Sequence, residues 1–427
     1  MRHTAFLCCA ASLVCGLLLV GAAAEVRADK ERLPTGREVG DQDLSPFYRW
    51  TAKLPDQAGV MLREELMPAQ PEITNAGLAK RILYTSMDLR WRAGIVPVSG
   101  TFYLPKGEAP TGGWPLVAWA HGTLGVADSC APSWAGHKPR DATYINRWLE
   151  SGFAVVATDY QGLGGPGPHA YLIWEAEGRS VLDGIRAALG VYRDKLASKV
   201  FVTGQSQGSG AALGATRIAP AYAPDVPLLA TVATGLVSSF PTGPYQPPDP
   251  VRVGSPHYLT LMILGGAMPD DGVSPDSLVT DKGRALLEAA RATCGTEMRA
   301  LARQQGINAG NAFVEPIDKV EARLTRVTDM QPVRMPVPVL LGTGLSDTSL
   351  SPRRQYAAVV ALCSAGSQLI WKTYPGATHN GGVSAAFHDA LAFFRSVMAG
   401  KTPQSNCSSI AEPGLPGAPG SGIPFND

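Results

Sequence analysis

Residues 199–214 read KVFVTGQSQGSGAALG and place Ser206 between Gly204 and Gly208. The run Val200–Val202 is typical of a buried strand, and the small residues after Gly208 are compatible with a helix. A G-x-S-x-G sequence between a strand and a helix predicts a nucleophile elbow, which exposes the serine hydroxyl. Such a sharp turn strains the serine backbone and leaves no room for side chains at the glycine positions. The alternative interpretation is a simple glycine- and serine-rich turn.

Apolar runs typical of a parallel sheet lie on both sides of this segment. They occupy residues 81–85, 96–104, 115–120, 153–158, 228–236, 337–341 and 368–374. Helical spacing of apolar residues occurs between them at 175–196, 352–362 and 385–398. This alternation predicts an α/β protein with a mostly parallel, doubly wound sheet. Together with the serine turn, it favours the α/β-hydrolase fold.

The alternation breaks over residues 238–333, which begin with a proline cluster. Helical patterns follow near 258–264 and 284–304, and we expect a helical lid or cap inserted into the sheet domain. The hydrolase core then comprises residues 25–237, with an extended arm at 25–50, and residues 334–411. The proline- and glycine-rich residues 412–427 are predicted to form a flexible tail, either disordered or loosely docked.

The N-terminus has the pattern of a cleavable signal peptide over residues 1–24. Arg2 precedes an apolar run at 5–20, and small residues end at Ala24, so we expect cleavage there or after Ala28. The apolar run is shorter than the roughly 20 residues of a membrane span. A lipid anchor on Cys15 has a poor sequence context. The sequence therefore predicts a secreted or periplasmic protein.

Composition and cysteine usage agree with an exported, soluble protein. The net charge is +1, which gives no indication of a nucleic-acid partner, and no second long apolar run predicts a stable membrane span. The expected mature chain retains four cysteines, an even number that predicts two disulfides with three connectivities open. They are Cys130, Cys294, Cys363 and Cys407. None has C-x-x-C spacing, so we expect no metal site. The oligomeric state is not indicated.

A serine nucleophile needs a base, and His379 is the candidate. It follows the strand at 368–374 through a Pro-Gly loop and precedes a helix, as the base does in a chain order of serine, acid and histidine. The alternative interpretation is a surface loop histidine. The other histidines of the expected mature chain are assigned to loops, helices or the insertion: His121, His137, His169, His257 and His388.

The base needs a carboxylate to orient it, and Asp347 is the candidate. It lies in the loop after the strand at 337–341, and Pro352 then begins a helix. Asp329 is the second choice, although it precedes the strand, and Asp159 lies upstream of the serine. A turn or helix-capping role is the alternative interpretation of Asp347.

Two backbone N–H groups are needed for an oxyanion hole. We assign one to Gln207, the residue after the nucleophile, and the other to Thr123, with Gly122 as the alternative. His121, directly before them, is then a supporting residue. An ordinary glycine turn at the end of a strand is the competing interpretation.

Several segments together resemble the secretory lipase family of α/β-hydrolases. They include Ser45–Tyr48, His121–Thr123, Cys130–Ser133, Ala157–Gly164, Glu177–Asp183, the serine segment, and the Asp347 and His379 loops. The resemblance spans about residues 45–407. It implies an ester hydrolase with a Ser206–Asp347–His379 triad and a helical lid. It also implies the disulfides Cys130–Cys294 and Cys363–Cys407.

These observations lead to one functional hypothesis with three alternatives. We expect a secreted serine hydrolase that cleaves hydrophobic carboxylic esters, triacylglycerol or related lipids, through an acyl-enzyme and without a cofactor or metal. Its partner is an ester or lipid substrate, which for a lipase is met at a lipid–water interface. The alternatives are a short-chain or aryl esterase without interfacial activation, a peptidase, and a non-catalytic binding protein on the same scaffold.

Overall fold

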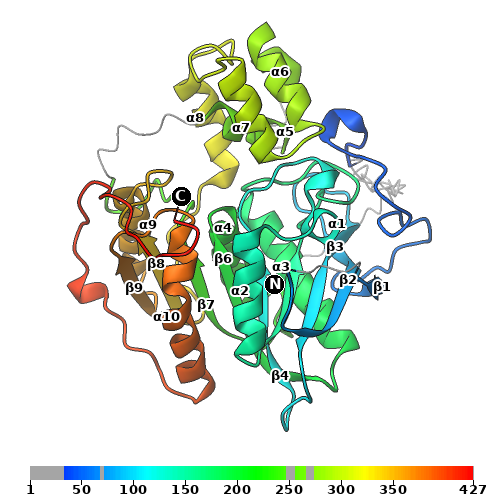
Figure 1. The fold of residues 1–427 in the computed structure, drawn as a ribbon, viewed down its shortest axis with the longest axis vertical. Coiled ribbons are helices and arrows are strands. Elements are labelled where there is room, and N and C mark those ends of the chain that lie inside the picture. Colours follow the sequence, from blue (N-terminus) through cyan, green and yellow to red (C-terminus); the bar gives the residue numbers. More distant parts are fainter. Residues whose placement is uncertain (1–32, 68–71, 247–254, 266–273, 427) are drawn as a thin grey trace, which may run out of the picture.

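The computed structural model describes residues 33–67, 72–246, 255–265 and 274–426 (Figure 1). The expected signal peptide, residues 1–24, lies outside the described residues. A nine-stranded sheet in the order β1-β2-β3-β5-β4-β6-β7-β8-β9 forms the centre of the fold. Strands β4 to β9 run parallel to one another, whereas β1, β2 and β3 are antiparallel to their neighbours. The predicted α/β-hydrolase architecture is thereby confirmed.

The strands have these bounds: β1 Met61–Leu66, β2 Ala76–Met87, β3 Ile95–Pro105, β4 Trp114–Ala120, β5 Ala154–Thr158, β6 Leu196–Gln205, β7 Leu228–Thr234, β8 Val339–Gly344 and β9 Leu369–Tyr374. The helices are α1 Pro132–Ala135, α2 Pro139–Glu150, α3 Trp174–Val191, α4 Gln207–Tyr222, α5 Pro256–Leu264, α6 Asp281–Ala290, α7 Gly295–Gln304, α8 Ile317–Thr328, α9 Pro352–Ser364 and α10 Gly381–Met398. Short 3-10 helices occur at Arg37–Val39, Asp128–Cys130, Pro275–Leu278 and Cys407–Ser409.

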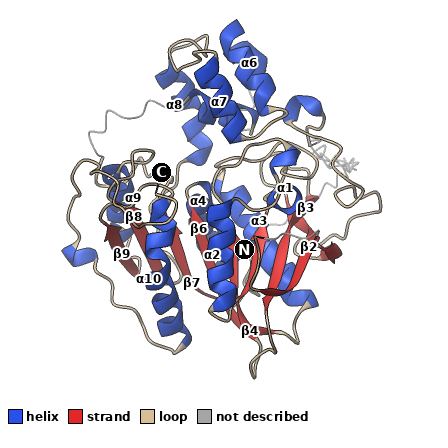
Figure 2. Ribbon diagram, viewed as in Figure 1, coloured by secondary structure: helices blue, strands red, loops and turns tan. Residues whose placement is uncertain are grey.

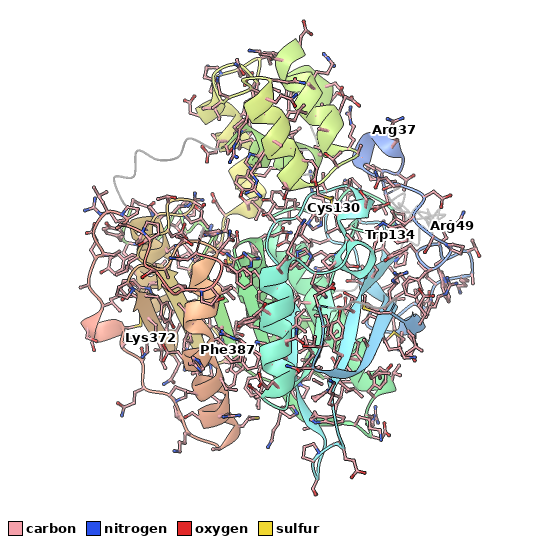
Figure 3. The ribbon with its side chains drawn as sticks, viewed as in Figure 1. Arg37, Arg49, Cys130, Trp134, Lys372 and Phe387 are labelled. Atoms are coloured by element: carbon pink, nitrogen blue, oxygen red, sulfur yellow. A yellow bond between two sulfur atoms is a disulfide. The ribbon has the colours of Figure 1, made fainter. Side chains whose placement is uncertain are left out.

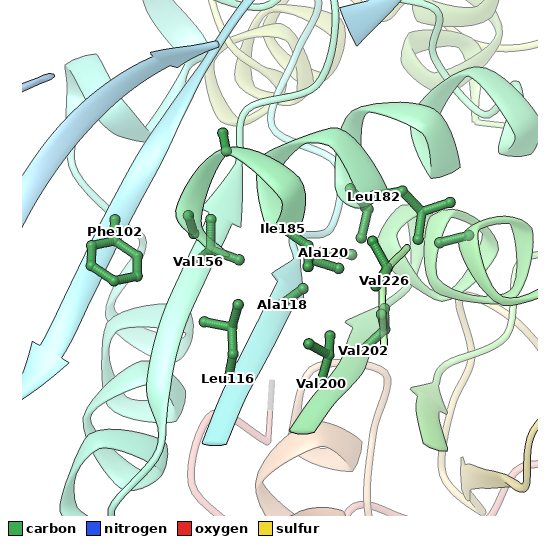
Figure 4. Close-up of a cluster of buried hydrophobic side chains, with 14 of the residues drawn as sticks. Phe102, Leu116, Ala118, Ala120, Val156, Leu182, Ile185, Val200, Val202 and Val226 are labelled. Atoms are coloured by element: carbon green, nitrogen blue, oxygen red, sulfur yellow. The ribbon is translucent and has the colours of Figure 1, made fainter. Parts of the chain in front are cut away.

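Helices cover both faces of the sheet, as the continuous apolar runs require. In β4, Leu116 and Ala118 pack with α3 and α4, and Figure 4 shows this cluster with Val200 and Val202 of β6 beside them. The alternate residues of β4, Val117 and Trp119, pack with α2 and α10. Those two helices cross in front of the red strands in Figure 2. The two-residue period of each strand therefore supplies two separate apolar cores.

Helices α5 to α8 lie between β7 and β8 in the chain and form a separate group beyond one end of the sheet (Figure 1). We call these four helices the cap. They enclose a core of their own, which includes Leu261, Leu286, Met298 and Leu324. The predicted helix over 284–304 is two helices, α6 and α7, interrupted at residues 291–294. Strand β1 and helices α2 and α8 were not predicted.

Of the two alternatives predicted for residues 412–427, disorder and loose docking, the structure has the C-terminal residues up to Asn426 docked by hydrogen bonds. The Gly417 N–H donates to the Leu345 carbonyl at 2.9 Å, and the Gly420 N–H donates to the Gly376 carbonyl at 2.8 Å. Asn426 accepts from the Thr378 N–H at 2.7 Å and donates to the Gly376 carbonyl at 2.9 Å. Composition indicated flexibility, but these backbone pairings give the segment a defined position.

Two disulfides are present in the part of the chain that the structure describes. Cys130–Cys294 joins the segment after β4 to the start of α7, and Figure 3 shows Cys130 where the cap meets the core. Cys363–Cys407 joins the end of α9 to the segment after α10. Among the described residues, no helix combines the length and apolar character needed to cross a membrane.

Candidate active site

Ser206 lies at the sharp turn between β6 and α4 with φ 57° and ψ −123°, a conformation that non-glycine residues rarely adopt. Its N–H donates to the Thr234 carbonyl of β7 at 3.0 Å. A Cβ added to Gly204 would lie 1.9 Å from the Gly208 carbonyl oxygen, and one added to Gly208 would lie 1.9 Å from the Ala120 carbonyl oxygen. Both glycines are therefore required by backbone contacts, as the sequence pattern predicted.

His379 and Asp347, which are 32 residues apart in the chain, meet beside this turn. The His379 Nδ1 lies 2.8 Å from the Asp347 Oδ2. The His379 ring also rests on Gly235, because a Cβ added there would lie 2.9 Å from its Cε1. The described hydrogen bonds include none between Ser206 and His379, although both residues line one pocket. Nδ1 is occupied by the carboxylate, which leaves Nε2 as the nitrogen for proton transfer.

Asp347 is fully buried, and every oxygen of its carboxylate is hydrogen bonded. Oδ1 accepts from the backbone N–H groups of Ser349 and Leu350 at 2.9 and 2.8 Å. Oδ2 accepts from Gln355 Nε2 at 2.9 Å in addition to its contact with His379. This set of donors holds the carboxylate in a fixed orientation. Sequence reasoning did not single out Gln355. Its position one turn into α9 is the only sequence feature that could have indicated it.

The candidate oxyanion loop follows β4 and lies against the same pocket as Ser206. Gly122 and Thr123 both line this pocket. A Cβ on Gly122 would lie 2.7 Å from Gln205 Oε1, so the loop approaches β6 closely. The Thr123 hydroxyl is hydrogen bonded to the Tyr171 hydroxyl at 2.7 Å. His121 is buried with Nδ1 2.7 Å from the Gly122 carbonyl, which suits a supporting residue.

Gln207, the other oxyanion candidate, begins α4, where backbone N–H groups lack helical partners. Its side chain lies in a buried polar cluster that sequence reasoning did not find. The Nε2 lies 2.8 Å from both His169 Nε2 and Glu177 Oε1. Burial raises the pKa of Glu177 to about 8 and lowers the pKa of His169 to about 3, because each charged form loses hydration. The cluster therefore fixes the position of the Gln207 side chain at the start of α4.

The other acidic candidates have different partners. Asp159 is buried and accepts from the hydroxyls of Ser99, at 2.6 Å, and Ser133. Asp329 lies in a bridge with Ser239, and its carbonyl accepts from Trp174 Nε1 at 3.1 Å. Neither has a described hydrogen bond to His379. Asp347 is thus the carboxylate that the structure brings to the histidine.

The pocket above Ser206 has a volume of about 360 Å³ and includes residues of the core, the cap and the C-terminal segment. Tyr258 and Thr296 enter it from the cap, and Phe425 enters it from the C-terminal segment. The Cys130–Cys294 disulfide ties the start of α7 to the oxyanion loop region, and the Gly295 N–H donates to the Leu124 carbonyl at 2.6 Å. The cap therefore forms one wall of the pocket.

The parallel sheet, the strained serine turn and the pairing of His379 with the buried Asp347 define a member of the α/β-hydrolase class. Within this chain, residues 137–242 match the family model described as Secretory lipase. The expected resemblance to this family is therefore confirmed.

One curated relative is Lipase A of Moesziomyces aphidis, 26% identical over 198 residues that span 42% of this chain. The match spans 40% of that relative's length. The structure is similar to Candida antarctica lipase A in its closed state, with a TM-score of 0.67, 19% identity and coverage of 88% and 91% of the two chains. It also resembles the rice cell wall degrading esterase LipA from Xanthomonas oryzae, with a TM-score of 0.60, 17% identity and coverage of 81% and 100%. The two solved structures show that the fold is shared.

Proposed function

We propose that this protein is a serine carboxylic-ester hydrolase. The observation that carries the proposal is the position of Ser206 on a strained turn, in the same pocket as a histidine already paired with a buried carboxylate. An exposed serine hydroxyl, a base and an orienting acid are the parts that acyl transfer requires. The secretory lipase match over residues 137–242 supports an ester as the substrate.

In the proposed mechanism, His379 Nε2 removes the Ser206 proton as Oγ attacks the acyl carbon. Both residues line one pocket, and hydrogen bonds between a catalytic base and its nucleophile often tighten only when substrate binds. Asp347 holds the imidazole with Nδ1–H toward its carboxylate and stabilises the imidazolium. The imidazolium then protonates the leaving alcohol, and water deacylates the serine.

The tetrahedral oxyanion is assigned to the backbone N–H groups of Gln207 and Thr123, with Gly122 as the alternative to Thr123. Gln207 supplies a donor from the start of α4, and the Gly122–Thr123 loop faces Ser206 across the pocket. Losing one such donor typically raises the barrier by about 3–4 kcal/mol.

For the substrate, we propose hydrophobic acyl esters, including triacylglycerol or related lipids. A short-chain or aryl esterase is the second candidate, and the pocket volume of about 360 Å³ favours it, since this space is at the lower end for a small-molecule site. We further propose export of the mature chain, which the two disulfides support. In the proposed division, residues 238–333 form the lid or cap and the flanking residues form the catalytic core.

The direct test is hydrolysis of 4-nitrophenyl esters of graded acyl length by the wild type and Ser206→Ala. We expect turnover by the wild type and a loss of at least about 10³-fold in the variant. Ser209→Ala serves as a matched control on the solvent-shielded side of the same turn, where the Ser209 hydroxyl donates to the Ser206 carbonyl at 2.6 Å. Full activity in Ser206→Ala would exclude this nucleophile.

The same esters, together with aminoacyl amides, separate the candidate functions. A lipase shows a rate increase when the ester forms droplets, whereas an esterase saturates on soluble short-chain esters. Cleavage of aminoacyl amides in preference to esters would indicate a peptidase. Absence of turnover on every substrate would indicate a binding protein.

A further inference from the structure

The pocket above Ser206 is bordered by cationic side chains from two parts of the fold. Lys138 precedes α2 and Arg140 lies in its first turn, whereas Arg299 lies on α7 of the cap. Among the described residues that line the pocket, none is an aspartate or a glutamate. The whole chain has a net charge of only +1, so this is a local concentration of positive charge.

Two of these three cations lack a compensating charge. Lys138 and Arg299 are exposed, and neither forms an ion pair with another residue in the described part of the chain. Arg140 differs, because its guanidinium lies 2.8 Å from Asp141 and donates to Asn380 Oδ1 at 2.6 Å. Arg140 is therefore held beside the His379 loop with its charge largely compensated.

Of the five arginines described in the cap, three form ion pairs, whereas Arg299 and Arg303 of α7 do not. Arg284 and Arg291 both pair with Asp276, and Arg323 pairs with Glu315 at 2.9 Å. Arg299, in contrast, is directed at the pocket without such a partner. An exposed cation is usually a solvated surface charge, but here cations of the core and the cap converge on one concave site.

His257, a buried residue of the same pocket, lies near this positive charge. Burial is the main cause that lowers its pKa to about 4, and the charges of Arg299 and Arg303 lower it further. His257 Nδ1 lies 2.7 Å from the Ser255 hydroxyl, and Nε2 has no hydrogen-bond partner among the described residues. The imidazole is thus neutral at pH 7, and the positive charge near it comes from the arginines.

We propose that the substrate is an anionic ester, whose acyl or alcohol part carries a carboxylate or phosphate that Lys138 and Arg299 bind. The inference rests on the proposed ester hydrolysis and names its substrate class. A concave site lined by charge of one sign raises the local concentration of oppositely charged substrate. A neutral triacylglycerol gains nothing from these two side chains, whereas an ester with a second, ionised group is attracted and oriented by them.

The test compares two soluble esters of equal acyl length and the same leaving group, 4-nitrophenyl hexanoate and the mono-4-nitrophenyl ester of adipic acid. The second ester replaces the terminal methyl group with a carboxylate. The ratio of their kcat/KM values is measured for the wild type, for Lys138→Gln, Arg299→Gln and the double variant. Lys282→Gln is the matched control, because it removes one exposed cation on α6, outside the residues that line the pocket.

We expect the ratio in favour of the anionic ester to fall about threefold in each single variant and about tenfold in the double variant. Lys282→Gln should leave the ratio unchanged. Raising the salt concentration to about 0.5 M should lower the ratio in the wild type and have little effect on it in the double variant. The Tm of each variant, compared with that of the wild type, shows whether the variant is folded.

A second arm places the charge on the alcohol side, with 4-acetoxybenzoate and 4-acetoxyphenyl phosphate compared with 4-methylphenyl acetate. A preference for one of these anionic esters that is reduced in the double variant supports the proposal. It also identifies which part of the ester carries the charge and which anion is bound. An unchanged ratio for every anionic ester in the double variant would overturn it. Absence of hydrolysis of all the esters, charged and neutral, would instead refute ester hydrolysis itself.

Discussion

The His379 Nδ1 lies 2.8 Å from the Asp347 Oδ2, and the same carboxylate accepts hydrogen bonds from Gln355 and from two backbone N–H groups of its own loop. Three donors other than His379 therefore hold the Asp347 carboxylate in place. Strands β8 and β9 are paired in parallel, so the loops after them emerge side by side. This pairing brings the two residues together.

Asp347→Asn should lower kcat on a soluble ester by about 10³–10⁴-fold, because the amide no longer selects the tautomer with Nδ1–H and no longer stabilises the imidazolium. The KM should change little, since Asp347 is buried behind the histidine. Steady-state kinetics check this prediction. Asp389→Asn is the control, because Asp389 lies on α10 and is paired with Lys372 and Tyr374 of β9. An equal loss in both variants would contradict the assigned role.

Gly204→Ala should lower the free energy of unfolding by at least about 3 kcal/mol or prevent folding, because the new Cβ would lie 1.9 Å from the Gly208 carbonyl oxygen. Chemical denaturation checks this value. Gly190→Ala on α3 is the matched control, with no atom within 4 Å of the added Cβ. That change should be neutral or stabilising by up to about 1 kcal/mol. A fully stable Gly204→Ala variant would show that the turn differs from the one described.

Replacing both Cys130 and Cys294 by serine should lower stability by about 2–5 kcal/mol and increase hydrogen exchange at the start of α7. This disulfide is one of the links between the cap and the oxyanion loop region, so kcat/KM should fall as well. The control is the double serine variant of Cys363 and Cys407, a pair that is not among the residues that line the pocket. It should lose stability with little change in kcat/KM. Equal kinetic losses would argue against a specific role of the cap link.

Glu177→Gln should remove one source of pH-dependent stability. The carboxyl pKa is about 8 in the folded protein because of burial and near its ordinary value in the unfolded chain, so the folded state retains the proton to higher pH. The contribution of Glu177 to stability is therefore fully present below pH 4.5 and is lost as the pH rises toward 8. As the pH rises through this window, the free energy of unfolding of the wild type should fall relative to that of Glu177→Gln. Urea titrations from pH 5 to about 8 measure it, and a pH-independent difference would contradict the prediction.

The sequence by itself determined the strand–serine–helix turn, the alternation of the parallel sheet and the residues at each strand end. These features are local, since glycine spacing, two-residue strand periodicity and chain order are all readable within short windows. The split of 284–304 into α6 and α7 was missed, because the helical pattern continues on both sides of the interruption.

The tertiary structure alone decided which distant groups meet. In the folded chain, Gln355 contacts the Asp347 carboxylate, and Glu177 and His169 contact Gln207. The C-terminal residues contact the His379 loop. The tertiary structure also brought Lys138 and Arg299, which are far apart in the chain, to one pocket. No local pattern records these contacts, because they arise from sheet order and from how the cap packs on the core, and both depend on the whole chain.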